Sequence, residues 1–124
     1  DANRLAMVIA VLEQHAGLRL ADRDVFASAV GGIRAVEPAS DLALLLAIAG
    51  AHFRRALAPA SCAVGEVGLG GEIRAVPQLE QRVREAARLG YKRMLVPKDQ
   101  PVAKVAGVQL VACGTVGKAI EELG

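Results

Sequence analysis

Two segments of the chain carry apolar residues at helical spacing. Within "NRLAMVIAVLEQHAG", one helical face collects Leu5, Ile9, Leu12 and Ala16. Within "PQLEQRVREAARLG", a second stripe collects Leu79, Val83 and Ala86, with arginines and glutamates on the opposite side. Gly17 and Gly90 follow these segments as ordinary helix stops. Each segment is therefore predicted to be an amphipathic helix that buries one face.

A third segment is apolar on most sides. Pro38 is well tolerated in a first helical turn, and the run from about Ala39 to Leu57 stays apolar until Arg54 and Arg55, whose charges suit a helix C-terminus. The longest apolar stretch, residues 42–51, is about half of the roughly 20 residues that a bilayer span needs. The pattern predicts a central buried helix, whose surplus apolar surface another subunit or domain would cover.

Short β-rich segments complete the pattern. "RDVFASAVGG" is predicted to form a strand that closes on Gly31-Gly32. "AVGEVGLGGEIRAV" is predicted to form a hairpin with its turn at Gly68 to Gly71, where positive φ or close backbone approach favours glycine. "KRMLVP" and "GVQLVACG" are two further strands, and "TVGKAIEELG" is a short helix that Thr115 caps. Strands and helices alternate in this last part, which predicts a right-handed parallel crossover.

Composition narrows the architecture to one domain. Apolar residues make up 53% of the 124 positions, and the aromatic residues are only Phe26, Phe53 and Tyr91. A chain of this length can bury one core, here of small aliphatic layers, so residues 1–124 are expected to form a single domain. The chain opens without Met, which suggests a piece of a longer protein.

Metal and nucleotide sites are not expected. Cys62 and Cys113 lie far apart and away from His15 and His52, whereas a zinc site needs clustered ligands. Two isolated thiols are typical of a reducing cytosol, which indicates a cytoplasmic location. The glycine-rich segments "GTVGKA" and "GEVGLGG" lack the spacings of a phosphate-binding loop and of a dinucleotide fingerprint. No cofactor is therefore predicted for this chain.

Ser40, at the entrance of the third helix, is a candidate nucleophile. First-turn N–H groups at such a position could hold an oxyanion, but a plain helix cap belongs there as well. A nucleophile needs a base. His52 lies twelve residues further along the same predicted helix, about 18 Å away, and nothing in the sequence brings His15 near. The residues favour a cap, with Asp41 stabilised by the helix N-terminus.

Three long motifs carry a resemblance to a known family. In order, they are "GGIRAVEPASDLALLLAIA", "GEVGLGGEIRAV" and "RVREAARLGYKRMLVP", and the opening "NRLAMVIAVLEQHAGL" agrees as well. They resemble the C-terminal, Lon-protease-like domain of the bacterial RadA (Sms) family of DNA repair proteins. The resemblance implies an α/β (α+β) fold of the Lon peptidase-like or ribosomal protein S5 domain 2-like type, with a mixed sheet covered by helices.

The resemblance also implies which parts stand outside this chain. Family members carry a zinc finger and a RecA-like ATPase core before this domain, so ATP, magnesium and zinc are expected only there. The strands that open the Lon-like domain are also expected to precede the "NRL" motif.

The same resemblance implies that the peptidase chemistry is lost. Active Lon peptidases have their serine in a "GPSAG" turn, and Ser40 falls at that place, whereas the position of the partner lysine is held by Arg82. A guanidinium keeps its proton above about pH 12, so it cannot act as the base. Asp41 adds negative charge beside the hydroxyl. We expect Arg82 at the border of its helix's apolar stripe, paired with Asp41 or Glu37 in the vestigial site.

Three hypotheses for the function follow. The first is a non-proteolytic platform that helps to assemble a hexameric ring and contacts DNA without sequence preference, while the missing ATPase core drives branch migration. Under this hypothesis, recombination proteins are possible partners, and no contact with a membrane is expected. Its DNA-binding candidates are Arg74, Arg82, Arg84, Arg88, Lys92 and Arg93, although the same stretch also fits a solvated helix face with i,i+4 ion pairs. The second is an active Ser–Lys peptidase. The third is a structural domain with no nucleic-acid role.

Overall fold

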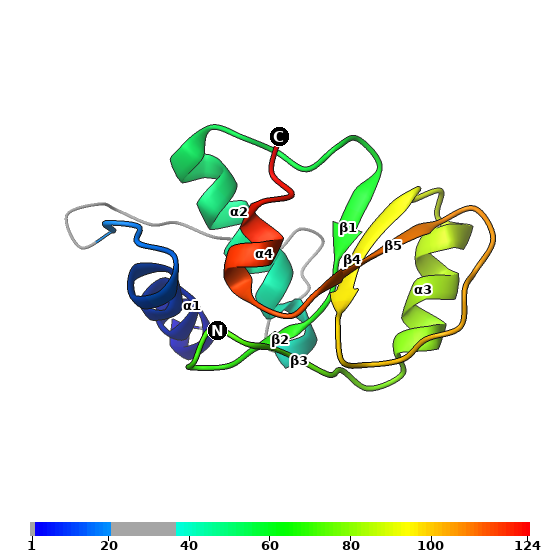
Figure 1. Ribbon diagram of the computed structural model, residues 1–124, viewed down its shortest axis with the longest axis horizontal. Coiled ribbons are helices and arrows are strands. Elements are labelled where there is room, and N and C mark those ends of the chain that lie inside the picture. The colour runs from blue at the N-terminus through cyan, green and yellow to red at the C-terminus, as the bar shows by residue number, and fades with distance from the viewer. Residues whose placement is uncertain (1, 21–36) are drawn as a thin grey trace.

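Helices cover both faces of a three-stranded sheet in the computed structural model, which describes residues 2–20 and 37–124 (Figure 1). The predicted α/β class is confirmed. The strand and turn predicted from "RDVFASAVGG" lie outside the described residues.

The sheet is parallel and has the order β1-β4-β5. Its strands are β1 (Ser61–Ala63), β4 (Arg93–Pro97) and β5 (Gln109–Cys113). Met94 lies between Cys62 and Leu110 in the register, and these three side chains point to one face. Leu95 points to the other face. The predicted parallel direction is confirmed, but residues 98–108, which join β4 to β5, contain no helix.

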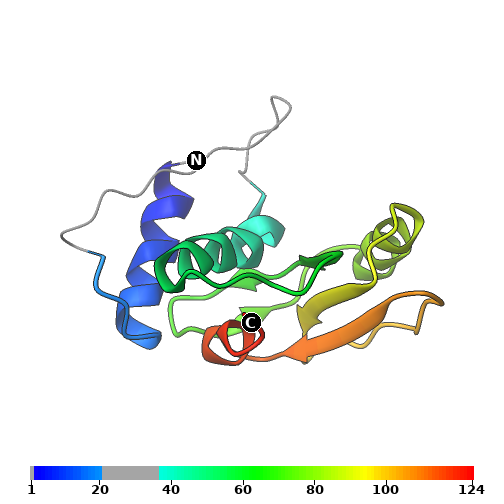
Figure 2. The same ribbon diagram turned by 90° about the horizontal axis from the view of Figure 1, so that it is seen from above.

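Each face of the sheet has its own core. Leu95 and Cys113 face a cluster built by α1 (Ala2–His15), α2 (Asp41–Phe53) and α4 (Val116–Ile120). Met94 and Val96 face a smaller cluster under α3 (Leu79–Arg88), on the opposite side. Figure 2 shows the same layers from above. The sheet is therefore a central layer that contributes side chains to both clusters.

The two amphipathic helices and the C-terminal helix agree with the prediction, with one shift. In α3 the buried residues are the predicted stripe Leu79, Val83 and Ala86. In α1 the buried centre is Val8, Val11 and Leu12, whereas the predicted Leu5, Ile9 and Ala16 are only partly buried at its side. The Thr115 hydroxyl accepts a hydrogen bond from the Lys118 N–H at 3.2 Å, which confirms the cap of α4.

Helix α2 is central and buried, as predicted, but it is shorter at both ends than the predicted run from Ala39 to Leu57. A 3-10 turn, η2 (Pro38–Ser40), precedes it, and Arg54 ends it in the left-handed conformation with φ 56°. The chain then folds back over Gly50, where a Cβ would lie 2.6 Å from the Arg55 carbonyl oxygen. The apolar pattern through Leu57 belongs to this returning segment and not to the helix.

The predicted hairpin is present, but a separate strand precedes it. Antiparallel strands β2 (Glu66–Val67) and β3 (Ile73–Arg74) flank the glycine turn, as predicted. β1 was not distinguished in the sequence from the hairpin's first strand. The two part at Gly65, because the Val64 N–H still bonds to the Leu95 carbonyl of β4, while the Gly65 N–H bonds to the Ala39 carbonyl before α2. The hairpin then covers the carboxyl end of β5, where the Ile73 N–H bonds to the Gly114 carbonyl.

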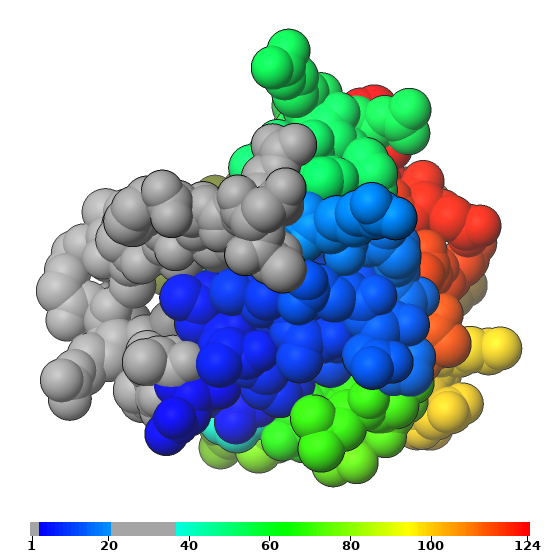
Figure 3. All heavy atoms as spheres, turned by 90° about the vertical axis from the view of Figure 1, so that its left-hand side faces the viewer, coloured from blue at the N-terminus to red at the C-terminus, as the bar shows by residue number. Residues whose placement is uncertain are grey.

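A buried ion pair joins α1, α2 and the hairpin. The Asp41 side chain is 1% exposed, and it accepts two hydrogen bonds from the Arg4 guanidinium, the Nε–Oδ1 distance being 2.6 Å. Its Oδ2 also accepts the Val67 N–H of β2 at 3.1 Å. Figure 3 shows α1 lying across the outside of the molecule, with the hairpin at its lower edge. One carboxylate therefore holds three elements that are distant in sequence.

Removal of the Asp41 carboxylate should cost more stability than any surface pair. Asp41→Ala leaves the Arg4 charge and the Val67 N–H without their partner, and we expect a loss of about 2–4 kcal/mol in the free energy of unfolding, measured with urea. Arg4→Met combined with Asp41→Leu should be more stable than Asp41→Ala, because no charge then lacks its partner.

Glu80→Ala is the matched control for this prediction. Glu80 pairs with Arg84 on α3, where both side chains are more than half exposed. We expect its loss to cost no more than about 0.5 kcal/mol. Equal losses for Asp41→Ala and Glu80→Ala would contradict a structural role of the buried pair.

Candidate functional site

Ser40 does not cap α2 with its side chain, and its hydroxyl has no hydrogen bond to a base among the described residues. Ser40 ends the 3-10 turn before α2 with helical dihedrals, φ −85° and ψ −4°, and its side chain does not cap the helix. The predicted cap is therefore wrong. The hydroxyl instead donates to the Glu37 carbonyl oxygen at 2.7 Å, because the 3-10 turn brings that carbonyl back over it.

Asp41 is not the partner of Arg82. The predicted Arg82–Asp41 pair is wrong, because Arg4 and the Val67 N–H already occupy the Asp41 carboxylate. The Asp41 hydrogen bond raises the pKa of Arg4 above its ordinary value, so Arg4 stays charged at every pH at which the fold is studied. Sequence reasoning missed Arg4, although a single acidic residue opening an otherwise apolar helix was a sign that a cationic partner was needed.

Arg82 pairs with Glu37, the other partner considered for it. Its guanidinium bonds to the Glu37 carboxylate, and its Nε donates to the Pro77 carbonyl oxygen at 2.9 Å. The side chain is 28% exposed, at the border position that the stripe predicted. α3 is thereby tied to the turn that holds Ser40. Arg82 and Ser40 thus both bond to Glu37, yet the guanidinium faces the carboxylate and not the Ser40 hydroxyl.

Neither histidine serves Ser40 in the described part of the chain. The His15 Nε2 lies 2.9 Å from the Leu69 carbonyl oxygen, in the hairpin turn. The His52 ring packs edge-on against Phe53 at the far end of α2, with ring centroids 5.0 Å apart. No hydrogen bond between Ser40 and a histidine or lysine occurs among the described residues.

Most of the predicted DNA-binding residues are neutralised by carboxylates. The pairs are Arg74–Glu72, Arg82–Glu37, Arg84–Glu80, Arg88–Glu85 and Arg93–Glu122. The Arg88 hydrogen bond holds the pKa of Glu85 below its ordinary value, so this pair is charged at neutral pH. Lys92 is exposed, and no ion pair involves it among the residues that the structure describes. The ion-paired helix face that the sequence also allowed is thus present on α3.

The candidates do not form one patch. Arg93 begins β4, opposite Gln109, and Arg74 ends the hairpin strand next to the Gly114 carbonyl beyond β5. Four steps along a strand separate the two ends of the sheet by about 13 Å. The structure therefore places the two ends of the basic stretch at opposite ends of the sheet.

The cysteines and acidic residues of the described part of the chain do not form a metal site. Within residues 2–20 and 37–124, no three His, Cys, Asp or Glu side chains are grouped closely enough to hold an ion. Burial raises the pKa of both Cys62 and Cys113, so neither thiol is activated. No helix in this part of the chain is long and apolar enough to cross a bilayer.

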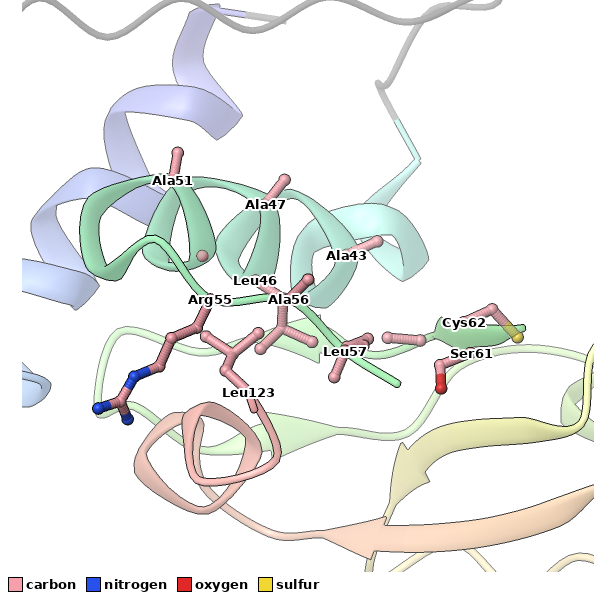
Figure 4. Close-up of a pocket in the computed structure, with 12 residues that line it drawn as sticks. Ala43, Leu46, Ala47, Ala51, Arg55, Ala56, Leu57, Ser61, Cys62 and Leu123 are labelled. Carbon is pink, nitrogen blue, oxygen red and sulfur yellow. The ribbon is translucent and has the colours of Figure 1, made fainter. Parts of the chain in front are cut away.

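An apolar groove lies between α2 and β1 (Figure 4). It encloses about 450 Å³, and α2 lines it with the small side chains Ala43, Ala47 and Ala51. Across it lie Leu57 and β1, and among the described residues the buried Ser61 hydroxyl of this strand has no hydrogen-bond partner. The groove offers an apolar contact surface but no reactive group.

Comparison with known proteins gives consistent relatives. No protein-family model matches the chain. It is 45% identical over 97% of its length to the DNA repair protein RadA of Synechocystis, 41% over 97% to that of Bacillus subtilis, and 43% over 99% to that of Pseudomonas aeruginosa. It covers 24%, 27% and 27% of these relatives, respectively. Over nearly its whole length, the chain therefore matches about the C-terminal quarter of the DNA repair protein RadA.

Proposed function

We propose that this chain is a non-proteolytic Lon-like domain that serves DNA repair and recombination as a platform for ring assembly and DNA contact. The chain spans about a quarter of the length of its relatives, which are DNA repair proteins RadA, and the ATPase core that it would serve is expected in the remaining part. The observation that carries the proposal is the commitment of both acidic neighbours of Ser40 to arginines, Glu37 to Arg82 and Asp41 to Arg4.

This charge arrangement opposes peptidase chemistry. A serine hydroxyl attacks only if a base takes its proton, and a lysine can do so only with a lowered pKa. Carboxylates near the dyad positions favour the protonated, charged form of any amine placed there. The Ser40 hydroxyl is also engaged as a donor to the Glu37 carbonyl.

The DNA contact is expected to be weak for one copy of the domain. The net charge is only +2, and most arginines of the basic stretch have carboxylate partners. Exposed ion pairs contribute little energy, so a phosphate could replace a carboxylate, but a cation with no such competitor is the better contact. Lys92 fits this description in the described structure, as do Arg54 and Arg55 after α2.

Assembly is supported by two apolar surfaces that differ from each other. The groove between α2 and β1 is one, and Leu69, 73% exposed at the tip of the hairpin turn, is the other. Figure 3 shows the hairpin and the chain after α2 at opposite ends of one face. A protruding residue of one copy in a groove of the next is a head-to-tail contact, which closes into a ring when the rotation allows it.

The chain should show no serine-dependent peptidase activity. We expect equal, background cleavage of casein or a fluorogenic peptide by the unchanged chain and by Ser40→Ala. Arg82→Lys should not restore cleavage, because Glu37 would raise the pKa of the new ammonium group. An active serine–lysine peptidase is the positive control, and cleavage by Arg82→Lys that Ser40→Ala abolishes would contradict the proposal.

DNA should be retained at low salt and released as salt rises. Lys92→Ala should weaken binding to all sequences alike and lower the slope of log affinity against log salt by about 1, as the loss of one phosphate contact does. Arg84→Ala is the matched control and should change the slope less, because Glu80 already pairs with Arg84. Fluorescence anisotropy measures both. Absence of retention at low salt would remove DNA from the proposal.

Self-association should require the groove and Leu69 on different copies. Ala47→Glu and Leu69→Glu should each leave the chain monomeric in sedimentation velocity, since either places a charge in an apolar contact. A mixture of the two variants should form a dimer, because one still has the groove and the other still has Leu69. Leu89→Glu, at an exposed position just after α3, is the control that should still assemble. Monomers in that mixture would contradict a head-to-tail interface.

A further inference from the structure

A hollow lies along α3, and the Glu37–Arg82 pair forms part of its lining. It has a volume of about 570 Å³ and is open to solvent. Its lining includes Gln78, Gln81, Leu89 and Tyr91, together with the Glu37–Arg82 pair. Leu89 is 60% and Tyr91 38% exposed, so an apolar and an aromatic side chain stand open together here.

The charges of this hollow cancel in pairs. Glu37 is bound by Arg82, and Glu85 is bound by Arg88 from the same helix. Each carboxylate of the lining therefore has a guanidinium partner, while the side-chain amides of Gln78 and Gln81 remain as hydrogen-bonding groups. A flat, uncharged ring with polar edges complements such a surface.

The backbone of Gln78 is strained, and its packing does not explain the strain. It stands before α3 in the left-handed conformation, with φ 56° and ψ 41°, and its side chain does not cap the helix. Glycine is the ordinary residue for this conformation, and another residue costs about 1–2 kcal/mol there. Strain of this kind tends to occur where a side chain has a task. Here it holds an amide at the rim of the hollow.

The residue that follows Tyr91 in the chain is a cation. Lys92 is exposed and takes part in no ion pair among the described residues. An aromatic ring with an adjacent free cation is the combination that proteins use for unpaired nucleotides, the ring for the base and the cation for the phosphate.

We propose that this hollow takes one unpaired nucleobase of single-stranded DNA, stacked on Tyr91, with Lys92 against the neighbouring phosphate. The inference rests on the DNA contact of the proposed function and specifies its form. A duplex keeps its bases inside the stack, so the site distinguishes single from double strands. Stacking is tolerant of sequence, because every base has a π-face.

The chain provides its own probe for this site. It contains one tyrosine and no tryptophan, so its intrinsic fluorescence comes from Tyr91 alone. We expect oligothymidine to quench this fluorescence at low salt as a base stacks on the ring. An abasic strand of equal length has the same phosphates and should not quench it. A duplex of equal length should bind more weakly than oligothymidine.

Substitutions separate stacking from charge. Tyr91→Ala should weaken oligothymidine binding about 5- to 100-fold and leave binding of the abasic strand unchanged. Tyr91→Phe keeps the ring and should keep the affinity. Phe53→Ala is the matched control, because Phe53 is similarly exposed, at 41%, but lies on α2. Gln78→Gly relieves the left-handed strain, so it should fold at least as well, and it should weaken oligothymidine binding by loss of the amide.

Three results would overturn the inference. If Tyr91→Ala binds oligothymidine as tightly as the unchanged chain, the base does not stack there, although the DNA contact stands. Equal quenching by the abasic strand would show that a phosphate and not a base reaches the hollow. Unchanged fluorescence with bound oligothymidine would leave the hollow to another occupant, such as an uncharged peptide. No binding of any DNA at low salt would instead remove the proposed DNA contact itself.

Discussion

The carboxylate of Asp41 is the constraint on which the arrangement of the larger core depends. An ionised group that is 1% exposed is tolerated only when its hydrogen-bonding capacity is filled, and here the Arg4 guanidinium and the Val67 N–H fill it. The first comes from α1 and the second from the hairpin, so both must be in place before the start of α2 can be buried. The helix that fills the core, α2, is thus positioned by a polar contact at its first residue.

This constraint also fixes the charge beside Ser40. Asp41 follows Ser40 directly, so its structural role places a negative charge one residue from the hydroxyl. Glu37, three residues before Ser40, holds Arg82. Under the proposed function, a working serine–lysine pair would therefore require changes at Arg82 and at both carboxylates, and the change at Asp41 would remove the contact that positions α2.

The features that can be predicted from the sequence are those that depend on interactions between residues close together in the chain. The stripe of α3, the glycine turn of the hairpin and the Thr115 cap depend on residues within a few positions, and they were predicted. The end of α2 depends on the chain folding back over Gly50, and the separation of β1 from β2 depends on Gly65 exchanging a partner in β4 for one before α2. Arg4 and Asp41 are 37 positions apart. A pattern of polar and apolar residues does not encode such partners.

The division of the basic stretch has a consequence for DNA contact. Residues 74–93 are neighbours in sequence, but the sheet separates their ends and carboxylates pair with their arginines. In this stretch Lys92 alone has no carboxylate partner among the described residues, so under the proposed function affinity would have to come from another source. Linking several weak sites makes each later contact intramolecular, which raises the overall affinity by factors of about 10²–10⁴ without any new contact. Under the proposed function, a platform with a modest site in each copy would therefore be effective on DNA only when it is assembled, and the apolar surfaces of the domain and its basic stretch would serve that one function.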